Sequence, residues 1–463
     1  MRSKTCWMVT TVALLVLAVL IGTTAGAATE PVVEWESWIG GTGHDVVFDI
    51  QETGDGGYLL AGNTTPVNGN GEAYLVKLDA NGTKVWEKTY GGPGEDVFLD
   101  VAATEDGFVL VGTTTAKATG LDRLMLLRVD MNGSVLFETN TSGRGIARGL
   151  GVTEAPDGSF VATGLSAVNP SSPSDIYLVR VGSMGMIAWE KYYGGQGEDR
   201  AFKVVGASDG GFVIAGAMTL DGQSGTDAYL LKVDRDGNRA WEKHYGTGDR
   251  SEAVFDLVRV ADGGYVMVGR SSSGSGWWGT PETSEVYVLR VDRDGVRQWE
   301  KTYGGPGFDR AWDAEELQDG YLLFGSKTAS DGSEDFLLMQ LSGTGAVTWE
   351  QNLSAGAGHD RGFALRMTPD GGWVAAGSSE SKGSGGRDIW VMKYAFTETA
   401  PSGTGTATPN VTVTVLPESP EQTSSVPTTA GTATPAPTTK APLGLEAVLG
   451  ALGAAGLFAA RRR

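Results

Sequence analysis

The sequence predicts an all-β fold, a seven-bladed β-propeller made of four-stranded blades. Three observations predict it. A unit of about 50 residues recurs seven times. Each unit contains four short segments of β-type composition, separated by turns rich in Gly, Asp and Asn. Gly supplies 70 of the 463 residues, about twice its ordinary share, as expected for a fold with many tight turns.

One aromatic position marks the repeat. The residues that occupy it are Trp35, Trp86, Phe137, Trp189, Trp241, Trp299 and Trp349, at spacings of 51, 51, 52, 52, 58 and 50 residues. In the first complete unit the four predicted strands cover 45–50, 57–63, 73–78 and 84–90. Four strands in about 50 residues are typical of a propeller blade, and the 3.6-residue period of helical repeats is absent.

The chain enters and leaves the repeat out of phase. It begins with a segment of the fourth kind at 32–39 and ends with a segment of the third kind at 389–394. We therefore expect the first strand to complete the last blade and so close the ring. The propeller is expected to span residues 28–396.

Six units share a motif in which an apolar residue, a Gly and a Trp or Phe stand four positions apart, as in Leu78-Gly82-Trp86. We expect the Gly to adopt a left-handed turn and the ring to fill the space between blades. The motif resembles the tryptophan-docking segment of quinoprotein-like propellers. The whole unit is similar to the WEKTYGG repeats of archaeal secreted propellers. This resemblance implies the fold but no particular activity, because propellers carry many functions.

The segments outside the repeat have the composition of trafficking signals. Residues 1–27 carry Arg2 and Lys4, an apolar run and small residues at 25–27, the pattern of a secretory signal peptide. Residues 397–442 contain 14 Thr and 8 Pro, which predicts a disordered stalk. Residues 443–463 are an apolar stretch ending in three Arg. With the Pro-Leu-Gly at its start, this segment resembles the archaeal PGF-CTERM signal, at which an archaeosortase attaches a lipid; a tail anchor is the alternative.

These features predict a protein that is secreted across the cytoplasmic membrane and tethered at the cell surface. Between 28 and 396, 52 acidic residues face 30 basic ones, which excludes nucleic acid as a partner. The one cysteine falls inside the predicted signal peptide, so no disulfide is expected. Six sequons permit N-glycosylation of an exported chain: Asn63, Asn81, Asn132, Asn140, Asn352 and Asn410.

Acidic residues recur where the innermost strand of each blade begins. They are Asp45, Asp96, Asp199, Glu252, Asp309 and Asp360, and four residues further on, expected on the same side of the strand, stand Asp49, Asp100, Asp256 and Asp313. One interpretation is a ring of carboxylates that binds Ca²⁺ at the mouth of the channel. The other is that each acid accepts backbone N–H groups from the Gly-rich loop beside it. Repetition in nearly every blade favours this second, structural role.

Other candidates break the symmetry of the repeat. His44 and His359 occupy equivalent positions in blades that ring closure makes neighbours. They would ligate a metal or act as acid and base, and ion pairs at the rim explain them equally well. Three arginines directly follow one of the acids at the start of the innermost strands: Arg200, Arg310 and Arg361. Together with the two histidines they are candidate ligand-binding residues, and ion pairs at the rim are the alternative.

A pair of adjacent tryptophans, Trp277 and Trp278, stands in the long polar loop between the second and third strands of the fifth unit. The pair would offer a platform for a sugar or a protein, or fold down over its own blade. The loops between second and third strands differ in every unit, which makes their face the expected contact surface.

The sequence therefore predicts a non-enzymatic binding module that presents one propeller face to an envelope protein or polysaccharide. No cofactor is expected. One alternative is a secreted glycan-cleaving lyase or hydrolase that uses His44, His359 and the acids at the start of the innermost strands. Another is a structural envelope protein that self-associates.

Overall fold

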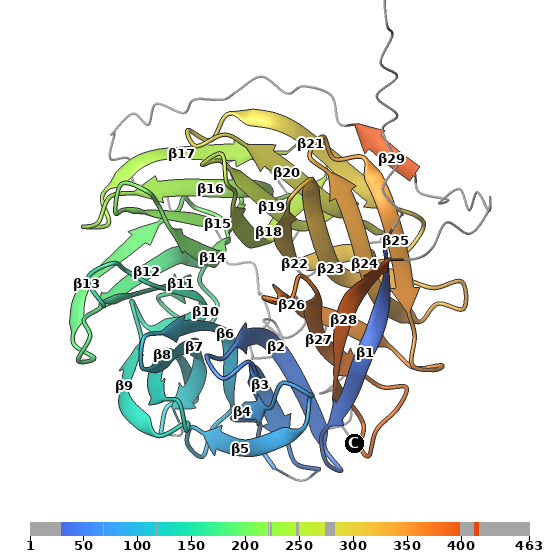
Figure 1. The fold of residues 1–463 in the computed structure, drawn as a ribbon. Helices are drawn as coiled ribbons and strands as arrows, with labels where there is room; N and C mark the ends of the chain where they lie inside the picture. The colour runs from blue at the N-terminus through green and yellow to red at the C-terminus, as the bar shows by residue number, and fades with distance from the viewer. Residues whose placement is uncertain are drawn as a thin grey trace, which may run out of the picture.

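The computed structural model describes residues 29–67, 69–116, 118–220, 222, 225–246, 250–273, 283–398 and 412–415. In these residues the secondary structure consists of strands arranged as seven sheets around a centre (Figure 1). The seven-bladed propeller predicted from the repeat is confirmed. No helix in this part of the chain is long and apolar enough to span a membrane. The predicted signal peptide and the apolar tail at 443–463 lie outside the described residues.

Six blades consist of consecutive strands, each antiparallel to the next, and the first strand of each lies nearest the channel. Blade 1 contains β2 (His44–Glu52), β3 (Tyr58–Thr65), β4 (Glu72–Leu78) and β5 (Lys84–Tyr90). Blade 2 contains β6 (Asp96–Thr104), β7 (Gly107–Ala116), β8 (Leu121–Asp130) and β9 (Val135–Thr141). Blade 3 contains β10 (Ile146–Glu154), β11 (Phe160–Ala167), β12 (Asp175–Val181) and β13 (Ile187–Tyr193). Blade 4 contains β14 (Asp199–Gly206), β15 (Phe212–Met218), β16 (Asp227–Val233) and β17 (Arg239–Tyr245).

Blade 5 contains β18 (Ser251–Arg259), β19 (Tyr265–Ser272), β20 (Ser284–Val291) and β21 (Arg297–Gly304). A short additional strand, β29 (Thr412–Val415), pairs with the outer edge of β21. Blade 6 contains β22 (Arg310–Leu317), β23 (Gly320–Thr328), β24 (Glu334–Ser342) and β25 (Val347–Leu353).

Blade 7 joins the two ends of the ring. Its strand order is β26 (Asp360–Met367), β27 (Trp373–Ser379), β28 (Asp388–Glu398) and then β1 (Thr29–Ile39). Strand β1 pairs with β28 along its length, from Thr29 opposite Glu398 to Ile39 opposite Ile389. The predicted closure by the N-terminal strand is therefore confirmed.

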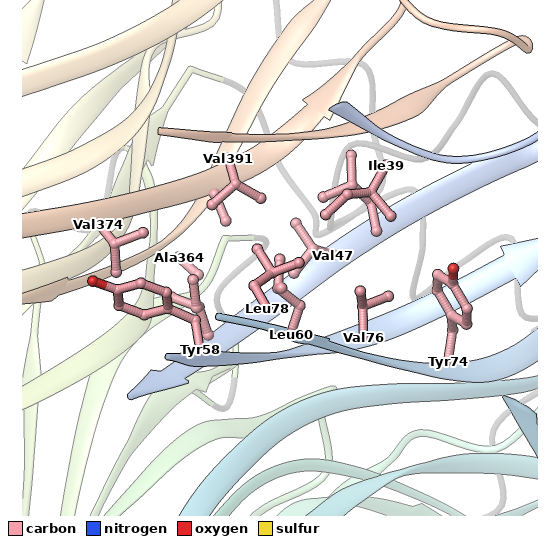
Figure 2. Close-up of a cluster of buried hydrophobic side chains, with 13 residues drawn as sticks. Ile39, Val47, Tyr58, Leu60, Tyr74, Val76, Leu78, Ala364, Val374 and Val391 are labelled. Atoms are coloured by element: carbon pink, nitrogen blue, oxygen red, sulfur yellow. The ribbon is translucent and has the colours of Figure 1, made fainter. Parts of the chain in front are cut away.

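The core lies between neighbouring blades. Figure 2 shows one such layer, in which Ile39 and Val391 of blade 7 face Val47 and Leu60 of blade 1. The inner three strands of a blade are buried on both faces because a neighbour covers each side. The outermost strand is covered on one side only, and its residues alternate between exposed and half-buried, as in β5.

The Gly-and-Trp motif is a contact between blades. Gly82 has a φ of 76°, and a Cβ atom there would lie 2.5 Å from the ring of Trp35 in blade 7. The indole of Trp35 donates a hydrogen bond to the carbonyl of Ala80 at 3.1 Å. A side chain at position 82 would strain the turn and meet the ring, so Gly satisfies both constraints. The expected turn and the expected packing are both present.

Each innermost strand contains a β-bulge. In β2 the register with β3 shifts between Val47 and Asp49, and the other six blades shift at the equivalent position. A bulge moves the alternation of side chains by one residue. The expectation that Asp45 and Asp49 share one side of the strand is therefore wrong: Asp49 lines the central cavity, whereas Asp45 bonds to its own entry loop.

Candidate functional site

The propeller has two faces with different character. We call turn face the side formed by the turns that link the first to the second strand and the third to the fourth. The opposite side, formed by the loops between the second and third strands and between blades, is the loop face. On the turn face one ion pair recurs in six blades, between a base on the third strand and an Asp of the first turn: Lys77–Asp55, Arg128–Asp106, Arg180–Asp157, Lys232–Asp209, Arg290–Asp262 and Lys393–Asp370. This repetition marks the turn face as structural.

Apolar side chains close the centre of the ring. Each innermost strand contributes one of them: Phe48, Leu99, Leu150, Phe202, Phe255, Trp312 and Phe363, all at most 8% exposed. Phe255 stacks on Trp312 with ring centroids 4.2 Å apart. With the charged residues beside them they enclose a cavity of about 60 Å³. That volume holds a few water molecules and no sugar ring.

Four aspartates beside this apolar ring tie neighbouring blades together. Each carboxylate accepts a hydrogen bond from a backbone N–H of the next blade. The four bonds run from Val101 to Asp49 (3.0 Å), Val152 to Asp100 (2.6 Å), Ala314 to Asp256 (3.2 Å) and Leu365 to Asp313 (2.8 Å). These acids therefore have a structural role.

Two basic residues neutralise part of this acidic layer. Lys203 Nζ lies 2.9 Å from Asp100 and 3.8 Å from Asp256. The Arg366 guanidinium lies 2.7 Å from Asp49 and 2.8 Å from Asp313. Five carboxyl groups, counting Glu315 at 3.9 Å from Arg366, thus face two cations.

Burial raises the pKa of four of these five carboxyl groups, whereas at Asp49 burial is outweighed by the charges of Arg366 and Lys203, which lower the pKa. Burial raises the pKa of Asp313 to about 8, although Arg366 acts in the opposite direction. Burial likewise raises the pKa of Asp100 to about 7, against the effect of Lys203. It also raises the pKa of Glu315 to about 7. Protons are therefore part of this layer near neutral pH.

The ring acids at the start of the innermost strands engage the loops beside them. Backbone N–H groups of the preceding loop donate to Asp45, Asp96, Asp199, Asp309 and Asp360 at 2.8–2.9 Å. Glu252 instead accepts from the Ser271 hydroxyl at 2.9 Å. The turn interactions offered as the structural interpretation are thus present. Among the described residues no group of three or more His, Cys, Asp or Glu side chains is arranged to hold a metal ion.

The predicted arginines lie on the loop face and each contacts a glutamate. Arg200 lies 3.3 Å from Glu198. Arg310 and Arg361 both bind Glu334, from opposite sides of the boundary between blades 6 and 7. Burial opposes ionisation of Glu334, but the two guanidinium groups outweigh it and lower the pKa of this carboxyl.

The two histidines flank the same region. The backbone N–H of Glu334 donates to His359 Nδ1 at 3.2 Å, and His359 is 41% exposed. His44 lies against Gly386, and burial together with the charge of Arg387 lowers the pKa of its imidazole.

Four residues that lie with Arg310 and Arg361 were not anticipated from the sequence: Arg270, Glu334, Glu380 and Arg387. Arg387 binds Glu380, whose carboxylate also lies 3.8 Å from Arg361 Nη1. A signal was available for part of the group. In every blade an acidic residue stands near the start of the third strand. The residue directly before that acid is charged only in blades 6 and 7, where it is Glu334 and Arg387.

We call the mouth cluster the set Arg270, Arg310, Arg361, Arg387, Glu334 and Glu380. Trp277 and Trp278 lie outside the described residues. Four of the predicted glycosylation sites, Asn81, Asn132, Asn140 and Asn352, are exposed, whereas Asn63 is 5% exposed and Asn410 lies outside the described residues.

Comparison with known proteins adds distant likenesses. No protein-family model matches the chain. The regulatory protein FlaEY of Caulobacter vibrioides is 26% identical over 256 residues, which are 50% of this chain and 26% of that protein. The matched region thus spans about a quarter of that relative's length.

Two solved structures are similar in their arrangement of strands. The Pan2 WD40 domain of Neurospora crassa has a TM-score of 0.45 at 9% identity, covering 77% of this chain and 95% of that domain. The polysaccharide lyase Uly1 has a TM-score of 0.48 at 9% identity, covering 75% of this chain and 89% of the lyase. No site residue is carried over from these proteins.

Proposed function

We propose that this protein is a non-enzymatic binding module displayed outside the cell, and that its loop face contacts an envelope polysaccharide or protein. The signal-like segment at 1–27 and the stalk and apolar tail after 397 support export and tethering, in the manner of the archaeal surface propellers that the repeat resembles.

The contrast between the two faces carries this proposal. The turn face repeats one ion pair in six blades, as a structural feature does. On the loop face, the second residue at the start of the innermost strand is Arg in four blades and apolar in three. These arginines pair with three different carboxylates, of Asp122, Glu198 and Glu334. Recognition surfaces on repeat proteins vary in this way because their ligands do not share the symmetry of the scaffold.

The experiment is retention of envelope material by the purified full-length chain. Polysaccharides and proteins from the producer's envelope are passed over the immobilised chain, and mass spectrometry follows both retained species and new products. Replacing Trp277 and Trp278 together by Ala is expected to weaken retention about tenfold, as the loss of an aromatic platform does.

A matched control replaces two apolar side chains on the turn face. Met184 and Met186 are 85% and 73% exposed, so their replacement by Ala changes exposed apolar area away from the loop face. This variant should retain envelope material as the parent does. Absence of retention by the parent, or equal losses in the two variants, would contradict the proposal.

The glycan-cleaving alternative has one observation in its favour. His359 is exposed, and its Nδ1 lies 3.8 Å from a carboxylate oxygen of Glu334. An imidazole that reaches solvent beside a carboxylate could exchange a proton with a bound substrate. New oligosaccharides among the products of the same experiment would replace the binding module by this enzyme.

A further inference from the structure

We infer that the mouth cluster over blades 5 to 7 binds an oxyanion, the carboxylate or sulfate group of an acidic polysaccharide. The inference rests on the proposed function and names the chemistry of its ligand. It follows from the number of buried cations in the cluster, from their unmatched hydrogen-bond donors and from their position at the surface.

The cluster concentrates positive charge in a buried place. Arg270, Arg310 and Arg387 are 8%, 7% and 3% exposed. Burial lowers the pKa of Arg270 to about 10, and the charge of Arg310 adds to the effect. Burial also lowers the pKa of Arg387, with a contribution from Arg361. Guanidinium groups that repel one another in a desolvated site need a counter-charge.

The carboxylates of the cluster are fewer than its guanidinium groups. Glu334 binds both Arg310 and Arg361. Glu380 binds Arg387 and lies 3.8 Å from Arg361, a distance that allows attraction but no hydrogen bond. Two carboxylates are thus shared among three arginines, Arg310, Arg361 and Arg387.

Several donors of the cluster have no acceptor among the described residues. They are Arg310 Nε, Arg361 Nη1 and Arg387 Nη1, each buried. Buried polar groups in folded proteins almost always have a partner, and an arginine fork is suited to paired oxygen atoms. A carboxylate or sulfate supplies such oxygens together with the missing negative charge.

One edge of the cluster reaches the surface of the loop face. His359 is 41% exposed and the Glu380 side chain is 30% exposed, so this edge of the cluster reaches solvent. At the position of Arg310 and Arg361, blades 1, 2 and 5 carry Val46, Val97 and Ala253. Blades 3 and 4 carry Arg148 and Arg200 there, which pair with Asp122 and Glu198. What distinguishes blades 6 and 7 is that two arginines share the single carboxylate of Glu334.

The overall charge makes the ligand easy to test. The chain has a formal net charge of −20, so it repels polyanions in the absence of a built site. Retention of an acidic polymer is consequently informative in a way that it is not for a basic protein.

The test measures binding of three polymers to the full-length chain: polygalacturonate for carboxylates, dextran sulfate for sulfates and dextran as the neutral parent. The decisive variant is Arg361→Gln. This substitution leaves Glu334 paired with Arg310 and Glu380 paired with Arg387, so neither carboxylate loses its last cation. Arg239→Gln is the matched control, because Arg239 lies in an exposed pair on the outer strand β17.

We expect the parent to bind one or both acidic polymers and not dextran. Arg361→Gln should weaken that binding about tenfold and Arg239→Gln should leave it unchanged, with thermal unfolding showing that both variants are folded. Absence of binding to both acidic polymers, or equal binding by Arg361→Gln and the parent, overturns the inference. If the parent retains envelope material but binds neither acidic polymer, the proposed function stands and this inference fails.

Discussion

Arg366 is the residue whose removal should most disturb the centre of the ring. It lies within 2.8 Å of both Asp49 and Asp313 and 3.9 Å from Glu315. In Arg366→Met a side chain of similar length remains, but three buried carboxyl groups lose their nearest cation. Breaking a buried pair from one side costs about 3–5 kcal/mol, so we expect a loss of about 4 kcal/mol in the free energy of unfolding at about pH 8.

The loss should depend on pH in a direction that the structure specifies. Burial raises the pKa of Asp313 to about 8 and that of Glu315 to about 7, above their values in an unfolded chain. The folded state therefore binds protons that the unfolded state releases, and stability falls as pH rises through this range. Without Arg366 the carboxyl groups hold their protons more strongly. The destabilisation should consequently be smaller at about pH 5.5 than at about pH 8.

Urea unfolding followed by tryptophan fluorescence measures this at both pH values. The control is Arg239→Met, which removes an exposed Arg–Glu pair at 2.6 Å and should cost at most about 1 kcal/mol. Equal destabilisation of Arg366→Met at the two pH values would refute the reasoning, as would a loss no larger than that of the control.

Two further predictions concern ring closure and catalysis. Ile39→Ala should lower the free energy of unfolding by about 2–5 kcal/mol, because Ile39 is 5% exposed in the layer that joins blade 7 to blade 1. The control is Val85→Ala, at a side chain that is 60% exposed, which should change the free energy of unfolding by less than about 0.5 kcal/mol in the same urea titration. His359→Ala should leave retention of envelope material within about twofold of the parent, because the imidazole contacts Glu334 of the protein itself. If the glycan-cleaving alternative holds, mass spectrometry will show that product formation is lost.

The ring itself was predictable because its determinants are local and repeated. The aromatic position that includes Trp35 recurs in every unit, and the phase difference between the two ends specified the closure by β1. Independent counts of one motif in seven copies reinforce one another. The bulge in each innermost strand was not predictable, because it inserts one residue without any distinctive residue type and reverses the side on which Asp49 lies.

The mouth cluster was predictable only in part. Arg310 and Arg361 stand at the same position of the repeat, which brought them to notice. Glu380 and Arg387 belong to the loop between the second and third strands of blade 7, whose sequence differs from that of the equivalent loops. Periodicity could mark Arg387 as a charged residue at a position that is uncharged in blades 1 to 5, but it could not give its partner. Their contact with Arg361 depends on how that loop folds back across the boundary between blades, a tertiary property that no local pattern encodes.

The closure by β1 also determines how the disc would respond to mechanical load. A pull applied at Glu398 enters the propeller through β28, which pairs with β1 on one side and with β27 on the other. The force therefore shears two ladders of hydrogen bonds at once, whereas a C-terminal strand at the sheet edge would unzip one bond at a time. With the N-terminal strand outside it, the last strand of the repeat is held between two neighbours and does not lie at the edge of its sheet.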